Sequence, residues 1–405
     1  MAGLAALALA YVLSQFYRSF LAVLTPALTA ELSASKADLS AASGAWFAAF
    51  ALAQFAVGIS LDRYGPKRTA AVLLALGGGG GAFLFAGASE PWMITAAMVL
   101  IGIGCSPVLM ASVFIFARTY KPAQLAILTS WLVAFGSAGN VIGASPLAAA
   151  AEAFGWREVI AALGVVTLLI ALGIVLFVRD PDRVEGAGGA GLSGYLELFR
   201  IRNLWLIAPL MALNYAPAMG IRGLWAGPYL ADVYGADALE IGNVTLFMAL
   251  SMVAGAFLYG PLDTLFRTRK WVAVGGNLLA VCVIVVLALN PAPGVANVTI
   301  LFALIGVLGG GYGLLMAHGR AFLPPHLTGR GVTLLNFYSI GGVGLAQFAT
   351  GAVYSASSVP GEPASGYQAL FWFYALALAA AIAIYLFARD AKPERPVEEI
   401  GAAAR

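Results

Sequence analysis

The sequence predicts an all-α membrane protein with twelve transmembrane helices in two pseudo-symmetric six-helix bundles. Of its 405 residues, 61% are hydrophobic and only 10% are charged, whereas soluble domains carry about a quarter charged residues. The charges gather in short clusters, and the apolar runs between them approach or exceed the roughly 20 residues needed to cross a bilayer. Lipid leaves backbone groups no external partners, so such long, uniformly apolar runs are expected to be helices.

Twelve candidate spans follow one another along the chain, with ends placed to within about 2–4 residues. They lie near residues 4–30, 40–61, 69–88, 91–117, 125–150, 157–178, 204–231, 239–262, 271–289, 296–320, 329–354 and 367–388. The longest internal polar stretch separates the first six from the last six.

This division predicts an N-terminal six-helix bundle at 1–180, a cytoplasmic linker at 181–203, a C-terminal six-helix bundle at 204–390 and a cytoplasmic tail at 391–405. Within the linker, the run from Gly186 to Gly191 is typical of a flexible connection. Residues 195–200 (Tyr-Leu-Glu-Leu-Phe-Arg) predict a short amphipathic helix on the membrane surface.

Lysine and arginine placement predicts the orientation. If the N-terminus is inside, the outer loops keep only Lys36 and Arg157, and the other basic residues outside the apolar runs fall on the cytoplasmic side. The expected location is therefore the inner membrane, with multiple passes and both termini cytoplasmic. Membrane lipids are the expected surroundings, and the chain is expected to be a monomer.

The two halves align at an offset near 202. The matches are Arg118, Pro122 and Leu125 with Arg320, Pro324 and Leu327, Pro26-Ala27-Leu28 with Pro228-Tyr229-Leu230, and Asp62 with Asp263 one residue off. Several matches in one register indicate a duplication, which is typical of transporters whose two halves rock about a shared site.

Residues 58–68 (Gly-Ile-Ser-Leu-Asp-Arg-Tyr-Gly-Pro-Lys-Arg) join the second and third spans. This segment resembles the loop signature between helices 2 and 3 of the major facilitator superfamily, although Pro66 stands where a basic residue is usual. The resemblance covers essentially the whole chain. It implies a twelve-helix fold with a central cavity lined mainly by helices 1, 4, 7 and 10, and alternating access, but it does not imply a substrate.

The same loop is predicted to act as a gating latch. Asp62 can accept from a neighbouring helix N-terminus, and Arg63, Lys67 and Arg68 can pair with carboxylates or lipid phosphates. The second copy contributes Asp263 and Arg267 to the predicted gate. The alternative interpretation is that the basic residues only set the topology.

Two arginines lie well inside predicted spans, Arg18 on the first and Arg222 on the seventh. A cation at the centre of a helix costs about 2.5–3.5 kcal/mol on insertion scales, and such residues usually face a cavity or a partner. No carboxylate lies at that depth in the sequence to neutralise them. Guanidinium groups match carboxylates and phosphates bidentately, so the pair predicts an anion site. Snorkelling to the interface is the alternative.

Polar neighbours support that prediction. On a straight helix, Tyr11, Gln15, Arg18, Ala22 and Thr25 share one face. The predicted substrate-binding set is Gln15, Tyr17, Arg18, Asn140, Asn214, Tyr215, Arg222, Asn336 and Tyr338, with Gln347 as a further candidate. The pattern also resembles organic-anion branches of the superfamily, including organophosphate exchangers, which carry basic residues on helices 1 and 7.

The predicted function is secondary transport of a small organic anion, a carboxylate or phosphate ester, by exchange or symport, with a proton or sodium ion as the coupling ion. No enzyme activity, cofactor, metal site or nucleic-acid partner is predicted, since no cluster of catalytic, metal-ligating or nucleotide-binding residues stands out. The alternatives are a drug or metabolite exporter, and a non-transporting receptor or assembly factor on the same scaffold.

Overall fold

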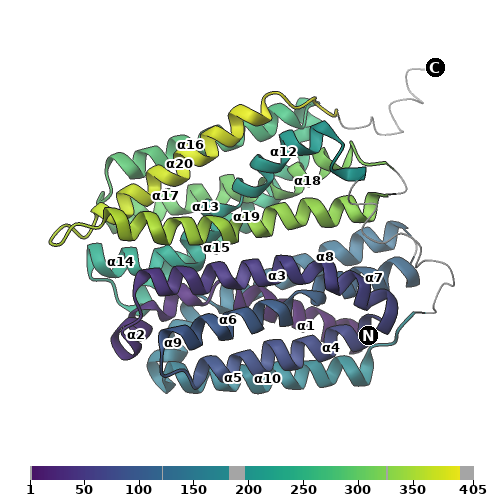
Figure 1. The fold of residues 1–405 in the computed structure, drawn as a ribbon, viewed down its shortest axis with the longest axis horizontal. Coiled ribbons are helices and arrows are strands. Elements are labelled where there is room, and N and C mark those ends of the chain that lie inside the picture. The colour runs from purple at the N-terminus through teal and green to yellow at the C-terminus, as the bar shows by residue number, and fades with distance from the viewer. Residues whose placement is uncertain (1, 121, 182–196, 325–326, 393–405) are drawn as a thin grey trace.

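The computed structural model describes residues 2–120, 122–181, 197–324 and 327–392 (Figure 1). Ten helices of this part are long and apolar enough to cross a membrane, and two bent helix pairs bring the number of spans to twelve. The only strand pairing in these ranges is an isolated bridge between Val359 and Glu362. The predicted fold class is confirmed. Of the predicted amphipathic helix, residues 195 and 196 lie outside the described residues.

The first half carries spans 1–6. Its elements are α1 (Ala2–Tyr17), α2 (Leu21–Leu32), α3 (Lys36–Tyr64), α4 (Pro66–Leu73), η1 (Leu74–Gly79), α5 (Gly80–Ala86), α6 (Pro91–Cys105), α7 (Pro107–Thr119), α8 (Pro122–Ile142), α9 (Ser145–Phe154) and α10 (Trp156–Phe177). Span 1 is the pair α1 and α2, and span 5 is the pair α8 and α9. Span 3 runs through α4, η1 and α5, and span 4 through α6 and α7.

The second half carries spans 7–12. Its elements are α12 (Arg202–Leu213), α13 (Ala216–Gly220), η2 (Ile221–Trp225), α14 (Ala226–Tyr234), α15 (Ala238–Phe266), α16 (Lys270–Leu289), α17 (Val295–Leu308), η3 (Gly309–Gly311), α18 (Tyr312–Arg320), α19 (Thr328–Ser357) and α20 (Ser365–Tyr385). Span 7 runs from α12 to α14, and span 10 from α17 to α18. Segments η1 and η2 are π-helical, and η3 is a 3₁₀ turn.

The two halves share structural details that the alignment of their sequences does not reveal. Helices α3 and α15 both have 29 residues, and each begins with a capping box, at Ser35 and at Asp237. Both end in a residue with positive φ: Gly65 (88°) and, unusually for a side-chain-bearing residue, Arg267 (54°). The positions 35 and 237, and 65 and 267, are both 202 apart, so the duplication extends to the helix ends.

Two aspartates occupy matching places after spans 6 and 12. Asp180 accepts the backbone N–H of Lys67 at 2.7 Å, and Asp390 accepts those of Arg269 at 3.2 Å and Lys270 at 3.0 Å. Each carboxylate thus satisfies free N–H groups at the start of the third span of its own half. We call this end of the molecule, with Gly65, Asp180 and Arg267, the linker end. The opposite end, with Ser35, Gly155 and Asp237, is the far end.

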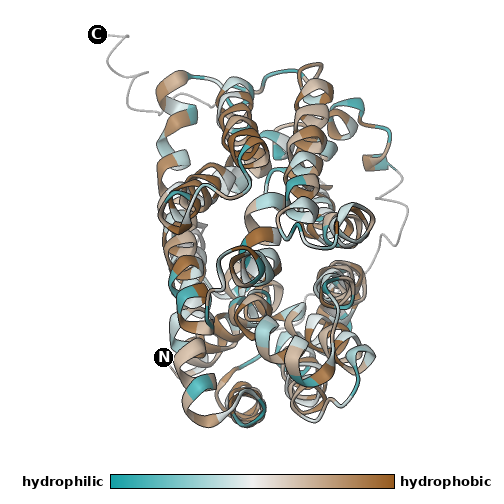
Figure 2. Cartoon of the chain, turned by 90° about the vertical axis from the view of Figure 1, so that its left-hand side faces the viewer, coloured by the Kyte–Doolittle hydropathy of each residue, from teal (hydrophilic) through white to brown (hydrophobic). Residues whose placement is uncertain are grey.

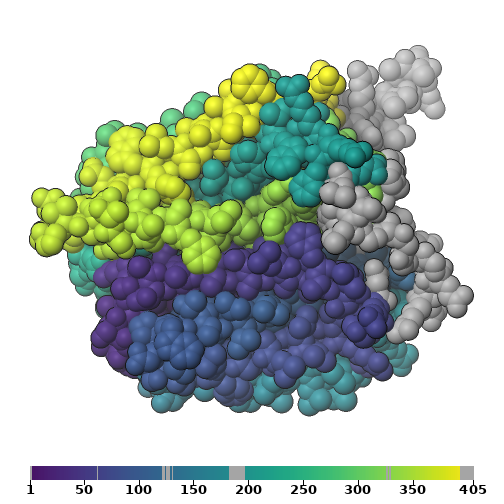
Figure 3. Space-filling model, in the orientation of Figure 1, coloured from purple at the N-terminus to yellow at the C-terminus, as the bar shows by residue number. Residues whose placement is uncertain are grey.

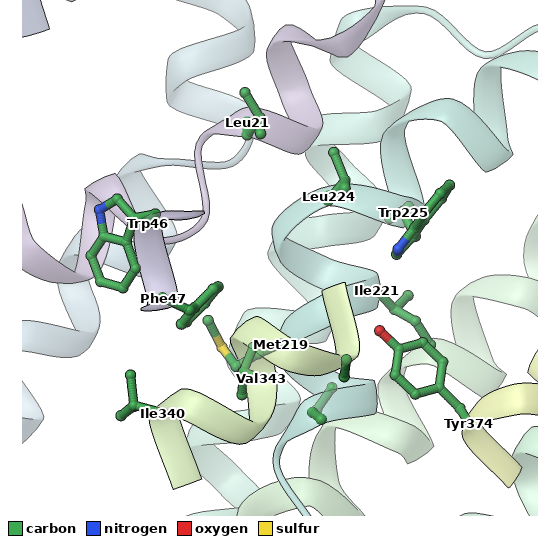
Figure 4. Close-up of a cluster of buried hydrophobic side chains, with 14 of the residues drawn as sticks. Leu21, Trp46, Phe47, Met219, Ile221, Leu224, Trp225, Ile340, Val343 and Tyr374 are labelled. Carbon is green, nitrogen blue, oxygen red and sulfur yellow. The ribbon is translucent and has the colours of Figure 1, made fainter. Parts of the chain in front are cut away.

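The two halves meet along a seam in which α3 lies beside α19 (Figures 1 and 3). Close to the far end, small residues allow backbone contact, because a Cβ on Gly44 would lie 3.1 Å from the carbonyl oxygen of Gly344. Phe47 of α3, Met219 of α13 and Val343 of α19 gather in the apolar core between the halves (Figure 4).

Large apolar side chains cover much of the outside. Phe257, Leu345 and Phe387 are 71%, 73% and 76% exposed, and brown, hydrophobic segments face outward in the second view (Figure 2). A soluble protein rarely exposes so much contiguous apolar surface. This surface fits contact with lipid hydrocarbon, and the chain is a multi-pass membrane protein.

Candidate functional site

A cavity of about 510 Å³ lies between the two halves. It is lined by Tyr11, Ser14, Gln15, Arg18, Phe50, Gln54, Cys105, Leu109, Met110, Val133, Ser137, Asn140, Tyr215, Ala249, Met252, Val253, Ala256, Tyr259, Gly260, Asp263, Gly309, Gly310, Tyr312, Gly313, Leu314, Ala317, Asn336 and Ile340. Spans 1, 4, 7 and 10 contribute, as the family resemblance implies. Spans 2, 5, 8 and 11 contribute as well. This volume suits a small organic molecule.

The halves are tied together at the far end. Lys36 forms an ion pair with Asp232 at 3.2 Å, and Ser145 donates to Asn243 at 2.9 Å. A Cβ on Gly227 would lie 2.0 Å from the carbonyl oxygen of Ala22, so spans 1 and 7 touch backbone to backbone. The cavity instead continues to Asp263, near the linker end. This conformation is therefore closed at the far end and extends toward the linker end.

Arg18 lies where span 1 breaks. Helices α1 and α2 meet at 51°, and the Ser19 hydroxyl contacts the carbonyl oxygens of Gln15 and Phe16 at 3.3 and 3.4 Å. Such hydroxyl-to-carbonyl bonds are known to bend helices. The straight face predicted for span 1 is therefore wrong beyond Arg18, and Ala22 and Thr25 do not line the cavity.

The Arg18 guanidinium faces the cavity with aromatic rings on one side. Its Cζ lies 5.3 Å from the Trp46 ring and 5.5 Å from the Phe50 ring, and its residue is only 9% exposed. Its Nε has no hydrogen-bond partner, and no acid of the described residues forms a salt bridge with it. A buried cation without a counter-charge is costly, so the guanidinium of Arg18 is electrostatically unbalanced within the described residues.

Amide and hydroxyl groups surround Arg18 on the first half. Gln15 donates to the Tyr11 hydroxyl at 2.8 Å, and Gln54 donates to the Ser106 carbonyl at 3.2 Å. The carbonyl oxygens of both glutamines, and the Ser14 hydroxyl, are buried without partners. They can hydrogen-bond to polar groups of a bound molecule next to its charge.

Arg222 is placed differently. It lies in the π-helical η2 and is 1% exposed, and it does not line the cavity. Its Nη2 donates to the Asn140 Oδ1 of the other half at 2.8 Å. Asn140 does line the cavity, so the second arginine stands behind a cavity residue and bridges the two halves.

The other predicted binding residues divide into two groups. Tyr215 and Asn336 line the cavity, and Asn336 accepts from Tyr312 at 2.9 Å. Tyr17 instead pairs with Thr167 at 2.9 Å inside the first half, and Asn214 donates to the Gly309 carbonyl at 3.3 Å. Neither of these two belongs to the cavity surface.

Tyr338 and Gln347 on span 11 also lie off the cavity surface. Gln347 donates to the Ser43 hydroxyl at 3.1 Å and accepts from Trp225 at 3.1 Å. Its backbone carbonyl accepts from Ser40. Gln347 thus joins α3 to α19 near the closed far end.

Two of the predicted gate residues have described contacts within their own halves. Asp263 pairs with Arg269 at 3.2 Å, and the Arg63 guanidinium lies 5.3 Å from the Tyr64 ring. Arg68 and Arg267 are exposed. Asp62 belongs to α3, but its side chain lies outside the described part, and the carboxylate found at the adjacent helix N-terminus, on the Lys67 N–H, is that of Asp180.

Several cavity residues were not among those predicted. Gln54, Ser14 and Tyr312 line the site, and Trp46 supplies the ring beside Arg18. A glutamine inside an apolar span is a sequence signal that could have singled out Gln54. Nothing local distinguishes Trp46 from a lipid-facing tryptophan.

A family model of the Major Facilitator Superfamily matches residues 7–224. The chain belongs to the major facilitator superfamily. The probable L-galactonate transporter of Escherichia coli (strain K12) is 25% identical over an alignment of 308 residues, and the match covers 66% of this chain and 61% of that protein. The probable sulfoacetate transporter SauU of Cupriavidus necator is 23% identical over an alignment of 293 residues, and the match covers 68% of this chain and 66% of that protein. The matches thus span less than two thirds of either relative.

Solved structures share the superfamily fold. A bacterial homologue of the human lysosomal transporter Spinster, inward-facing and occupied, aligns with TM-score 0.77 at 20% identity, covering 95% of this chain and 96% of that chain. The D-xylose–proton symporter aligns with TM-score 0.75 at 14% identity, covering 96% and 98%. Membership of this superfamily indicates a transporter rather than an enzyme.

Proposed function

We propose that this transporter moves a small organic anion across the inner membrane by alternating access, as an exchanger or symporter. One observation carries the proposal: the guanidinium of Arg18 is buried on the cavity surface, and none of the described acidic residues forms a salt bridge with it. Among the lining residues whose side chains the structure describes, Asp263 is the one carboxylate, and it is already paired with Arg269 near the linker end. The middle of the cavity is therefore electropositive.

The names of the two relatives agree with an anionic substrate, because galactonate and sulfoacetate both carry a carboxylate. The rings of Trp46 and Phe50 hold the guanidinium by cation–π contact. These ring contacts do not use the N–H groups of the guanidinium, which therefore remain available to hydrogen-bond a ligand. A carboxylate, sulfonate or phosphate ester would accept those donors.

The linker end is proposed to face the cytoplasm, because it carries most of the basic residues outside the spans. Both termini and the gate residues Asp62, Arg63, Lys67, Arg68, Asp263 and Arg267 would then lie on that side. Since the far end is closed by the contacts of Lys36, Ser145 and Gly227, the conformation described would be inward-facing. Reopening the far end would require breaking these contacts, and the gate residues would close the linker end in exchange.

Counterflow in proteoliposomes tests the proposal. Vesicles loaded in turn with each member of a panel of small carboxylates, sulfonates and phosphate esters are expected to accumulate at least one labelled anion, and neutral galactose should not be accumulated. Arg18→Gln should abolish this counterflow, whereas Arg202→Gln, which removes an exposed arginine at the start of α12, should leave it intact. Unchanged anion counterflow in a correctly folded Arg18→Gln protein would contradict an anion site at Arg18.

A further inference from the structure

The two walls of the cavity differ in chemistry. The first half contributes Arg18 with the partnerless oxygens of Ser14, Gln15 and Gln54. The second half presents Ala249, Met252, Val253 and Ala256 of α15, spaced i, i+3, i+4 and i+7. That spacing places all four on one helical face, so an apolar stripe faces the polar group around Arg18.

Span 10 extends the apolar wall. Gly309, Gly310, Gly313, Leu314 and Ala317 line the cavity from η3 and α18. A Cβ placed on Gly313 would meet no atom within 4 Å. Because Gly313 also lines the cavity, the missing side chain leaves room for part of a ligand beside this wall.

Two hydroxyl groups of the second wall, those of Tyr259 and Tyr312, are already used. Tyr259 donates to the Leu308 carbonyl at 3.1 Å, and Tyr312 donates to Asn336 at 2.9 Å. A polyhydroxylated chain against α15 would lose its water and find few partners, which is unfavourable. An aliphatic or aromatic group would gain by leaving water.

We propose that the substrate is an amphipathic monoanion. Its charged group binds Arg18, and its aliphatic or aromatic tail lies against α15 and α18, with Gly313 setting the tail volume accepted. This inference rests on the proposed function and narrows it. It also separates this chain's substrate from a sugar acid, whose hydroxyl groups the second wall could not satisfy.

The preference for an apolar tail can be tested by calorimetric titration. The purified full chain in detergent is titrated with hexanoate and with gluconate. The two acids have six carbons and one carboxylate each, and differ in the hydroxyl groups of the tail. Hexanoate is expected to bind at least tenfold more tightly, and Met252→Gln should reduce this preference by about tenfold, the scale of a small change in an apolar pocket. Titration of the same acids into detergent micelles without protein gives the background from partition.

The substitution Gly313→Val tests whether Gly313 sets the volume of the tail that the cavity accepts. It should weaken phenylacetate binding by about tenfold and leave acetate binding within twofold. Gly275→Val is the matched control, because a Cβ on this exposed α16 glycine also meets no atom within 4 Å and Gly275 is not on the cavity surface. It should change neither affinity.

The outcomes separate the inference from the proposed function. Gluconate binding that equals or exceeds hexanoate binding, and that is lost in Arg18→Gln, would overturn the amphipathic tail and leave the anion site standing. Equal loss of acetate and phenylacetate in Gly313→Val would also overturn it. Binding of either acid that is unchanged in Arg18→Gln would overturn both.

Discussion

The two halves repeat a scaffold but not a site. Helices α3 and α15 agree in length, in their capping boxes and in the positive φ that ends them. Arg18 and Arg222 lie within two positions of each other when the halves are aligned at the offset of 202. Yet of the two only Arg18 lines the cavity, and Arg222 is bonded to Asn140 of the other half. Helix ends must satisfy the same backbone groups in both halves. The contacts of a side chain in the middle of a span instead depend on the residues around it, which differ between the halves.

This difference suggests a division of labour. The arginine of the first half has donors to offer a ligand, while the arginine of the second half contributes to the contact between halves in the far-end-closed conformation. The same asymmetry applies to the walls, which are polar around Arg18 and apolar along α15. Under the proposed function, alternating access needs one group that binds the substrate and others that stabilise the closed end, and the two halves would supply these roles separately.

The largest effect should separate the two arginines. Arg18→Gln removes charge-assisted hydrogen bonds worth about 1.5–3 kcal/mol, so galactonate or hexanoate affinity, whichever binds the parent protein, should fall roughly 10- to 100-fold. Arg222→Gln should change this affinity by less than about threefold, because its guanidinium bonds Asn140 and is off the cavity surface. Equilibrium binding to both variants checks this. Equal losses would mean that Arg222 also reaches the ligand.

Gly227→Val should impair closure of the far end. Its Cβ would lie 2.0 Å from the Ala22 carbonyl oxygen, and overpacking of this kind costs about 1–3 kcal/mol or more. Thiol labelling of a cysteine at Thr25 should increase, and transport should fall roughly 10- to 100-fold. Gly80→Val is the control, since a Cβ there meets no atom within 4 Å. Unaltered labelling would show that spans 1 and 7 separate more easily than their contact indicates.

The twin carboxylates at the linker end should differ in strength. Asp390→Asn should lower the stability of the folded protein by about 1 kcal/mol, as for loss of a helix cap, and Asp180→Asn by less. Asp390 accepts two backbone N–H groups and the Thr268 hydroxyl, whereas Asp180 accepts the Lys67 N–H. Thermal unfolding in detergent at pH 7 measures both. Equal losses would remove the distinction.

The contribution of Asp390 should also depend on pH. Partial burial acts to raise the pKa of this carboxyl, but the Thr268 hydroxyl and the backbone N–H groups of Lys270 and Arg269 outweigh it, so the pKa is lowered. Its stabilisation is thus complete above the unfolded value of about 3.9 and is lost as pH falls through the lower folded value. Between pH 5 and pH 3, the gap in unfolding temperature between parent and Asp390→Asn should shrink. A constant gap would contradict this linkage.

The smallest effect concerns the ion pair at the far end. Lys36 and Asp232 are 24% and 26% exposed in their side chains, and partly exposed pairs contribute about 0.2–1 kcal/mol. Lys36→Ala should shift the balance toward the far-end-open state by roughly two- to fivefold, as read from Thr25 cysteine labelling. The exchange Lys36→Asp with Asp232→Lys should restore much of it. Failure of the exchange would point to Tyr367, which donates to Asp232 at 2.6 Å, as the stronger partner.

Part of the candidate site could be predicted from local rules. The rule that a polar group inside an apolar span marks a site predicts five residues that the structure does bring to one cavity, namely Arg18, Gln15, Asn140, Tyr215 and Asn336. The same rule predicts Tyr17, which lies elsewhere because its hydroxyl is hydrogen-bonded to Thr167 within the first half. A polar residue in a span must find some partner, but local rules do not say whether that partner is a ligand or another helix.

Composition and charge placement alone determined that this chain crosses a membrane many times, since the energetic demand of lipid on backbone and charge acts residue by residue. The residue matches at an offset near 202 determined that its two halves are related. Only the tertiary structure decided which arginine faces the cavity, where span 1 bends and which wall is apolar. Those features depend on contacts between residues up to hundreds of positions apart, such as Asn140 with Arg222 and Ala22 with Gly227, and no local pattern encodes them.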